Sequence, residues 1–178
     1  MITKIKEVTI YSIRKEWLPA SKEMNIVKAA TDMFIRITHS CLFGKHEKEF
    51  LIKQFKNGAE IREPVGQAMQ KVIEQSLSRE YHLHLILFPE LFPVYLTKFD
   101  RELKKNSVEI RKCISAMIKE RLENPDQEEA TDLLSILIKD PTFSTMDEAH
   151  IIDEAIAFFM AASMTQSPLL ANTICYLI

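Results

Sequence analysis

The chain has 178 residues, with 23 Lys and Arg against 25 Asp and Glu, three cysteines and only three glycines. This length suits one ordinary domain, and a hydrophobic fraction of 47% with 27% charge excludes wholesale disorder. A net charge of −2 gives no general electrostatic reason to bind nucleic acid, so no such partner is expected. The cysteines at positions 41, 113 and 175 form neither a CxxC pair nor a Cys/His cluster, which excludes a disulfide framework and a zinc module.

The N-terminal third predicts helices. Charges interrupt the first residues at once, so no signal peptide is expected, and only Val8 to Ile13 has noticeable strand character. A sheet-based domain is therefore not expected. Apolar residues recur at spacings of three and four from Ile26 to Cys41, which predicts a helix. Gly44 is expected to end that helix in the left-handed conformation.

Two further helices and a broken apolar segment are predicted in the middle of the chain. One helix runs from about Glu60 to Ser78, with Pro64 in its first turns. The apolar segment from His82 to Leu96 contains two Phe-Pro steps, which disfavour helix at the residue before each proline. Arg101 to Glu123 reads as a long amphipathic helix. The residues expected to face inward from the two helices are Val65, Met69, Val72, Ile73, Leu103, Ile110, Ile114 and Met117.

The C-terminal part predicts a short helix over Ala130–Lys139 and a long last helix that a capping box, Thr145-x-x-Glu148, opens. Its residues 155–178 carry no charge over 24 positions, which is long enough to span a bilayer. Pro168 and several polar residues interrupt this run, so we expect a buried core helix rather than a membrane span. The helix reaches the last residue without a capping residue or a breaker, and the chain is therefore expected to be truncated.

Few residues stand at the spacing that a catalytic, metal or ligand site requires. His82 and His84 diverge on a helix and have no third ligand nearby, so packing or surface roles are expected and no metal ligand is predicted. The last helix is the exception, because Ala161 and Thr165 lie four apart on one face. Small residues there permit close approach of a flat or bulky group beside a hydroxyl. The alternative is a contact between helices, with Thr165 bonding back to the carbonyl of Ala161, and the residues alone favour it.

Several segments together resemble the cytochrome P-450 family of haem-thiolate monooxygenases. Thr31–Gly44 resembles the family's E helix, which ends in Phe-Gly, and the Phe-Pro steps at residues 88 and 92 resemble the link between its F and G helices. Arg101–Glu123 resembles the G helix, Asp132–Ile138 the H-helix region, and Met146–Thr165 the entrance and middle of the long I helix. The resemblance implies an all-α chain that covers about helices D to I. Its regions would be 1–44 (D and E), 60–123 (F and G) and 130–178 (H and I).

The I-helix signature of that family reads [Ala/Gly]-Gly-x-[Asp/Glu]-Thr-[Thr/Ser], and residues 161–166 stand in its place. Ala161 and Thr165 match it, whereas Ala162, Met164 and Gln166 depart. The resemblance implies that Ala161 and Ala162 line the groove over the haem where dioxygen sits. It implies that Thr165 hydrogen-bonds the oxygen and steers protons towards O–O cleavage. Met164 replaces the acid that relays those protons and has no exchangeable proton.

Other parts of the family pattern are missing from these residues. No cysteine has glycine two residues later, so the haem-binding loop and its axial thiolate are absent, as is the Glu-x-x-Arg pair of the K helix. The resemblance therefore implies the middle of a haem enzyme whose parent inserts one atom of dioxygen into a small apolar substrate. This piece alone is expected to be inactive.

The resemblance also implies partners. A reductase would donate electrons to the parent, with Phe158 and Ala161 expected to contact substrate. Phe88 to Leu96 would form the pocket roof and contact a membrane surface. By resemblance the location is the endoplasmic-reticulum membrane facing the cytosol, or the cytoplasm. Two other classes remain open, a non-enzymatic all-α interaction protein and a helical protein anchored by its apolar C-terminal helix.

Overall fold

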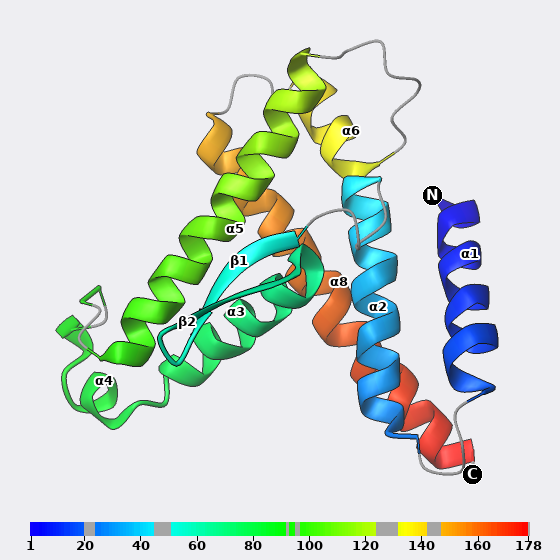
Figure 1. Cartoon of the computed structure of the whole chain (residues 1–178), viewed down its shortest axis with the longest axis horizontal. Coiled ribbons are helices and arrows are strands. Elements are labelled where there is room, and N and C mark those ends of the chain that lie inside the picture. Colours follow the sequence, from blue (N-terminus) through cyan, green and yellow to red (C-terminus); the bar gives the residue numbers. More distant parts are fainter. Residues whose placement is uncertain are drawn as a thin grey trace.

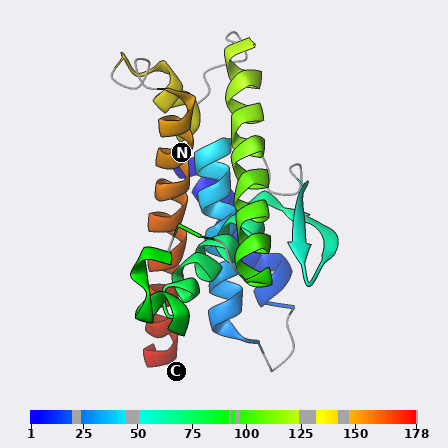
Figure 2. The same cartoon turned by 90° about the vertical axis from the view of Figure 1, so that its left-hand side faces the viewer.

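A computed structural model describes residues 1–19, 24–44, 51–91, 93–94, 97–123, 132–141 and 147–177. Helices dominate this part of the chain, beside one antiparallel sheet of two strands. The longest helix, α8 (Glu148–Leu177), crosses the molecule beneath α2, α3 and α5 (Figure 1). The view turned by 90° shows α2 (Ile26–Phe43) between α5 (Lys98–Glu123) and α8 (Figure 2). The expectation of a mostly helical chain is confirmed.

The N-terminal segment is helical, so the expectation of strand character over Val8–Ile13 is wrong. Helix α1 (Ile2–Ser12) continues into the π-helix η1 (Ile13–Trp17) and packs against α2. Lys4 and Val8 are partly buried and Ser12 fully so, at a spacing of four. The contact of this helical face with α2 therefore overrode a weak β-propensity.

Helix α2 follows the prediction for residues 26–41 and for its end. The Asn25 side chain accepts the Lys28 amide at 3.0 Å, which caps the first turn. Gly44 ends the helix with φ of 72°, in the left-handed region. A Cβ at this position would lie only 2.8 Å from Oδ2 of Asp132, so close packing as well as backbone conformation requires glycine there.

A β-hairpin replaces the start of the predicted 60–78 helix. Strands β1 (Leu51–Lys56) and β2 (Ala59–Pro64) pair antiparallel across a turn formed by Asn57 and Gly58, with φ of 53° and 82°. The prediction is therefore wrong for residues 60–64, where Pro64 is the N-cap of α3 (Val65–Arg79). The dipeptide Asn-Gly is the strongest short-range hairpin signal, and it was present in the sequence.

Side chains of α5 hold the hairpin in place. The Asn106 amide accepts the Phe55 N–H at 2.7 Å and donates to the Phe55 carbonyl at 3.0 Å, so it substitutes for a neighbouring strand. The Glu102 carboxylate accepts the amides of Gly58 and Asn57 at 2.7 and 3.1 Å. These bonds satisfy strand and turn groups that would otherwise point at the helix.

The remaining elements agree with the sequence except at their boundaries. The apolar segment is broken as predicted, into α4 (Leu83–Leu87) and a 3₁₀ turn, η3 (Pro89–Leu91). Helix α5 begins three residues earlier than expected, and α6 (Leu133–Lys139) begins after Asp132, which accepts the Ser135 amide at 3.0 Å. Ala130 and Thr145, where the short helix and the last capping box were predicted, lie outside the described residues.

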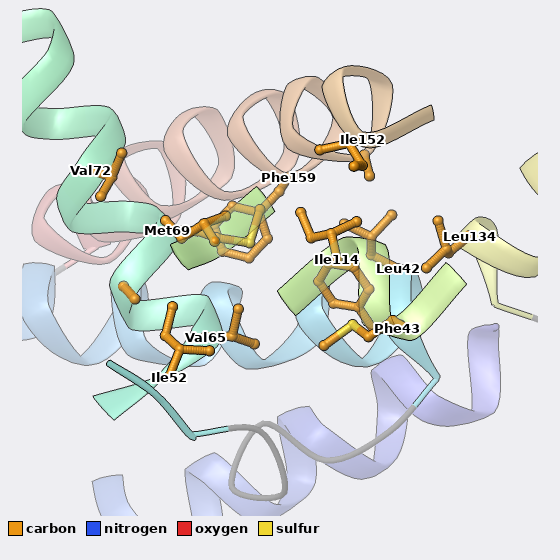
Figure 3. Close-up of a cluster of buried hydrophobic side chains, with 14 of the residues drawn as sticks. Leu42, Phe43, Ile52, Val65, Met69, Val72, Ile114, Leu134, Ile152 and Phe159 are labelled. Atoms are coloured by element: carbon orange, nitrogen blue, oxygen red, sulfur yellow. The ribbon is translucent and has the colours of Figure 1, made fainter. Parts of the chain in front are cut away.

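The hydrophobic core joins α2, α3, α5, α6 and α8 (Figure 3). All eight residues predicted to face inward from the two middle helices are buried. The Arg121 guanidinium ties three helix ends together, since it donates to the Phe43 carbonyl at 2.6 Å, to Ser135 at 3.0 Å and to Asp132 at 3.4 Å. Within the described ranges, none of the helices combines the length and apolarity that crossing a bilayer needs.

Candidate functional site

Helix α8 has two faces of different character. Its inward face follows a spacing of four and packs on the core through Ala155, Phe159, Ser163, Ser167 and Ala171. Its outward face carries three of the predicted site residues, since Phe158, Ala161 and Thr165 are all exposed. Ala162, the fourth, is half-buried beside them. The structure therefore brings the predicted residues onto one surface of small, apolar and hydroxyl groups without charge.

The Thr165 hydroxyl donates a hydrogen bond of 2.7 Å to the carbonyl of Ala161. This is the back-bond that the residues alone favoured. The Thr165 side chain is nevertheless exposed. Because its proton is directed at Ala161, the oxygen presents its lone pairs to the outward face and acts there as an acceptor.

Ser163 makes the same kind of bond from the opposite side of the helix. Its hydroxyl lies 2.7 Å from the Phe159 carbonyl and 3.3 Å from Oε1 of Gln70 on α3. The Gln70 amide in turn donates to Glu74 at 2.7 Å. These buried contacts fix α8 against α3, so the rotation of the outward face is set by packing on the inward one. Sequence reasoning missed this pair, because nothing in the spacing of α3 indicates which polar residue faces α8.

A groove of about 270 Å³ lies between α3, α5 and α8. Its lining is mostly apolar, with two serines and one arginine: Met69, Val72, Ile73, Ser76, Leu77, Ser107, Ile110, Arg111, Ile156 and Met160. Helix α8 contributes Met160, the residue before Ala161, whereas Phe158 does not line the groove. Met160 was missed by sequence reasoning, because a methionine in an apolar helix carries no signal of its own.

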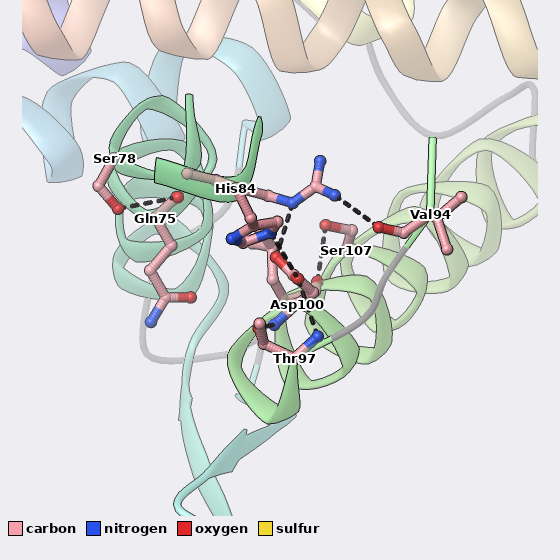
Figure 4. Close-up of polar contacts among 9 residues, drawn as sticks. Gln75, Ser78, His84, Val94, Thr97, Asp100 and Ser107 are labelled. Carbon is pink, nitrogen blue, oxygen red and sulfur yellow. Dashed lines mark hydrogen bonds and ion pairs between the residues drawn. The ribbon is translucent and has the colours of Figure 1, made fainter. Parts of the chain in front are cut away.

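A buried ion pair joins the end of α3 to the first turn of α5 (Figure 4). Nε of Arg79 lies 2.7 Å from Oδ1 of Asp100, and both side chains are buried. Arg79 also donates to the Val94 carbonyl at 3.0 Å, while Asp100 accepts the Thr97 amide at 3.0 Å. Burial alone would raise the pKa of Asp100, but the hydrogen bonds from Thr97 and Arg79 and the guanidinium charge outweigh it and lower the pKa.

The polar residues of the chain offer no metal centre in its described part, where no group of three His, Cys, Asp or Glu residues converges. His82 packs against Phe99, with ring centroids 5.2 Å apart, as expected for a packing histidine. Burial raises the pKa of Cys113 to about 11 and also raises the pKa of Cys41, so both remain thiols at neutral pH. Cys175 is exposed on the last turns of α8.

The sequence matches a known protein family. The sequence model described as cytochrome P450 matches residues 2–178. The chain belongs to the cytochrome P450 family. The predicted family resemblance is thus confirmed, and with it a family of haem monooxygenases that use dioxygen, a substrate and a redox partner. None of the curated proteins compared with the chain matches it.

The residues of this P450 chain fit one side of a haem and not the other. The outward face of α8 offers small side chains and a hydroxyl, which suits a flat apolar macrocycle with a small ligand above it. A thiolate ligand for the iron is not offered by Cys41 or Cys113, because both are half-buried within the helices α2 and α5 and neither has a glycine two residues later. Cys175 lies ten residues beyond Thr165 on the same helix, about 15 Å along it, so one helix cannot serve both faces.

Proposed function

We propose that this chain forms the oxygen-side wall of a haem-dependent monooxygenase that inserts one atom of dioxygen into a small apolar substrate. The observation that carries the proposal is the outward face of α8, where Thr165 presents an acceptor oxygen one turn from the exposed Ala161. Membership of the P450 family gives this face its chemical context.

The haem, when bound, supplies the activation of dioxygen. The methyl side chains of Ala161 and Ala162 leave space beside the helix for a small ligand. Thr165 holds its own proton on the Ala161 carbonyl, and its lone pairs accept a hydrogen bond from a protonated neighbour. Such an acceptor positions a proton next to the reacting oxygen without supplying a second charge.

Met164 marks a departure in proton supply. The family signature has an acid there, and a thioether can neither donate nor take up a proton at neutral pH. In the structure Met164 is half-buried and packs against the core cluster, so its side chain serves packing. A proton that reaches Thr165 must therefore come from another donor.

The groove between α3, α5 and α8 supports an apolar substrate. Most of its lining is apolar, and it includes Met160, the residue that precedes Ala161 in the chain. Phe158 lies on the outward face, 41% exposed, and does not line the groove, so its substrate contact would be made on the outward face, beside Ala161. We therefore assign substrate contact to Phe158 and Ala161 as predicted, and add Met160 to them.

The broken segment over Phe88–Leu96 would form the roof of the pocket and touch a membrane surface. Its neighbour α4 exposes Leu83, Ile86 and Leu87, which are 69%, 57% and 61% accessible. Residues 92, 95 and 96 lie outside the described part of the chain, but Arg79, paired with Asp100, also donates to the Val94 carbonyl and so ties that residue to α3 and α5. Exposed apolar side chains of this kind are what a lipid surface binds.

The axial thiolate and the electron-donating reductase lie outside this proposal for the chain itself. None of its cysteines stands in a haem-binding loop, so residues 1–178 alone are proposed to be inactive. The division into regions 1–44, 60–123 and 130–178 and the location at a membrane or in the cytoplasm also remain proposals.

The replacement Thr165→Ala tests the role of the hydroxyl in a haem-loaded protein that contains this segment. We expect the ratio of oxygen consumed to product formed to rise several-fold, because the acceptor that positions the proton is lost. The matched control is Thr173→Ala, which removes an equivalent back-bond (2.8 Å to Leu169) from an exposed site two turns further on. Equal ratios in both variants and the unmodified protein would refute the role proposed for Thr165.

A further inference from the structure

The groove between α3, α5 and α8 is open to solvent and has one charged residue in its lining. Leu77 on α3 and Met160 on α8 are apolar lining residues that are 43% and 40% exposed. Arg111 lines the groove from α5, and its side chain is exposed as well. The groove volume of about 270 Å³ is roughly nine times the ~30 Å³ share of a liquid water molecule, which gives room for a chain of about eight to ten methylene-sized groups.

The Arg111 guanidinium already holds a carboxylate in the structure. Its Nη2 forms an exposed ion pair with Asp153 of α8. Asp153 lies three residues before Ile156, which lines the groove from the same helix, so the pair joins α5 to α8 beside the groove. A guanidinium has several N–H donors, and an exposed ion pair contributes little to stability. Arg111 can therefore bind a second carboxylate, or exchange Asp153 for it, at low cost.

The solvent-facing side of α5 around Arg111 is basic. Over residues 98–112 this helix carries six Lys and Arg but only three Asp and Glu. These three acids have partners elsewhere, which are a buried arginine, the hairpin amides and a lysine for Asp100, Glu102 and Glu109, respectively. Lys104 and Arg111 are exposed and lie three residues before and four residues after Ser107, which lines the groove. The electrostatic potential along the α5 side of the groove therefore favours an anionic group.

We propose that this groove binds an amphipathic carboxylic acid. The hydrocarbon chain lies among Met69, Ile110 and Met160. The carboxylate binds the Arg111 guanidinium, in the place that Asp153 occupies in the structure. Burial of the chain supplies most of the affinity, and the charge-assisted hydrogen bonds decide which end of the ligand faces solvent. As the substrate class of the monooxygenase this acid rests on the proposed function, whereas its binding does not.

Methyl NMR of the 178-residue chain tests the site directly, because Met69 and Met160 line the groove. Decanoate, used below its micelle concentration, is the probe, and decanol is the comparison because it has the same chain without a charge. We expect decanoate to shift both methionine methyl signals saturably and to bind about tenfold more tightly than decanol. The proposal is overturned if neither methyl signal shifts, or if the two compounds bind with equal affinity.

Arg111→Gln and Asp153→Asn should change decanoate binding in opposite directions. Loss of the guanidinium should weaken it about tenfold, whereas loss of the competing carboxylate should strengthen it several-fold. Neither change should alter the affinity for decanol. Both residues are exposed and their pair contributes little to stability, so both variants are expected to fold.

Lys112→Gln is the matched control for Arg111→Gln. It removes the exposed charge of the adjacent residue, which is not among the described residues that line the groove. We expect this variant to keep the affinity for decanoate. Equal weakening in the two variants would show an effect of net charge alone and would overturn the role of Arg111.

A second measurement separates the site from the proposed function. In a haem-loaded protein that contains this segment, decanoate should be oxidised, and Arg111→Gln should raise the KM for decanoate about tenfold without changing the KM for decanol. If decanoate binds as expected but is not oxidised, its role as substrate is refuted while the binding site stands. If Thr165→Ala leaves the ratio of oxygen consumed to product formed unchanged, the role proposed for Thr165 fails and the NMR result is unaffected.

Discussion

The junction of α3 and α5 and the outward face of α8 use polar groups in opposite ways. At the junction, Arg79 and Asp100 are buried and find their partners within the chain, including Val94 and Thr97. On α8, Thr165 is exposed beside small residues and keeps an accepting oxygen turned away from the protein. The first arrangement stabilises the fold. The second leaves the Thr165 oxygen able to accept a hydrogen bond from a group outside the chain.

The difference shows how a structural polar site is told apart from a functional one. A buried ion pair is costly unless it is fully hydrogen-bonded, so completeness is a condition for its existence. An exposed acceptor costs little to maintain in water, so folding does not require its presence. Substitutions at the junction should therefore change stability, whereas substitutions on the outward face should change binding and turnover.

The largest effect is expected for Asp100→Ala. This change leaves the Arg79 guanidinium buried without its carboxylate, which costs about 3–5 kcal/mol in the free energy of unfolding. Chemical denaturation measures it. The control is Asp153→Ala, which removes an exposed ion pair with Arg111 and should cost about 0–1 kcal/mol. Equal costs for the two variants would show that the junction is not the structural anchor.

A smaller loss of stability is expected for Gly44→Ala, and Gly58→Ala is its matched comparison. Both residues have positive φ, so alanine at either costs about 1–2 kcal/mol in backbone strain. Only at Gly44 would the new Cβ meet the carboxylate of Asp132, at 2.8 Å. Gly44→Ala should therefore be the more destabilising of the two in thermal melts. The reverse order would mean that the packing between the ends of α2 and α6 is loose.

The smallest effect is a dependence of stability on pH. The folded chain lowers the pKa of Asp100 below its ordinary value of 3.8, so the unfolded chain binds the proton more tightly. The contribution is complete above about pH 4 and is lost as the pH falls through the folded pKa. Urea denaturation between pH 2 and 6 should give a shallower slope for Asp100→Asn than for the unmodified chain. Identical slopes below pH 4 would rule out this linkage.

Helices were predictable from the sequence where a periodic apolar face, buried against the core, determines them. The inward residues of α3 and α5 follow the spacing of three and four, and each of those predicted is buried. Boundaries were less predictable, because they depend on single hydrogen bonds. Helix α5 starts early because Thr97 and Asp100 cap each other's amides, each at 3.0 Å, and this capping pair directly follows the segment predicted to be broken.

The hairpin and the structure of the N-terminus were misjudged for different reasons. For Val8, local propensity was weighed without the packing against α2 that decides the outcome. For the hairpin, the local turn signal Asn57-Gly58 was overlooked, and only the contact of Phe55 with α5 lay beyond local reasoning. The candidate site was predictable as far as one helix face goes, since Phe158, Ala161 and Thr165 share it. Met160 and Gln70 were not predictable, because their roles arise from contacts between α8 and α3.

The central claim is that the outward face of α8 borders the ligand side of a haem. The most direct test is carbon monoxide binding by a haem-loaded protein that contains this segment, with Ala161→Phe against Ala116→Phe, an exposed alanine on α5. The account predicts that Ala161→Phe weakens binding by about tenfold, equivalent to ~1.4 kcal/mol of overpacking, while Ala116→Phe leaves it unchanged. Unchanged affinity in Ala161→Phe would contradict the claim.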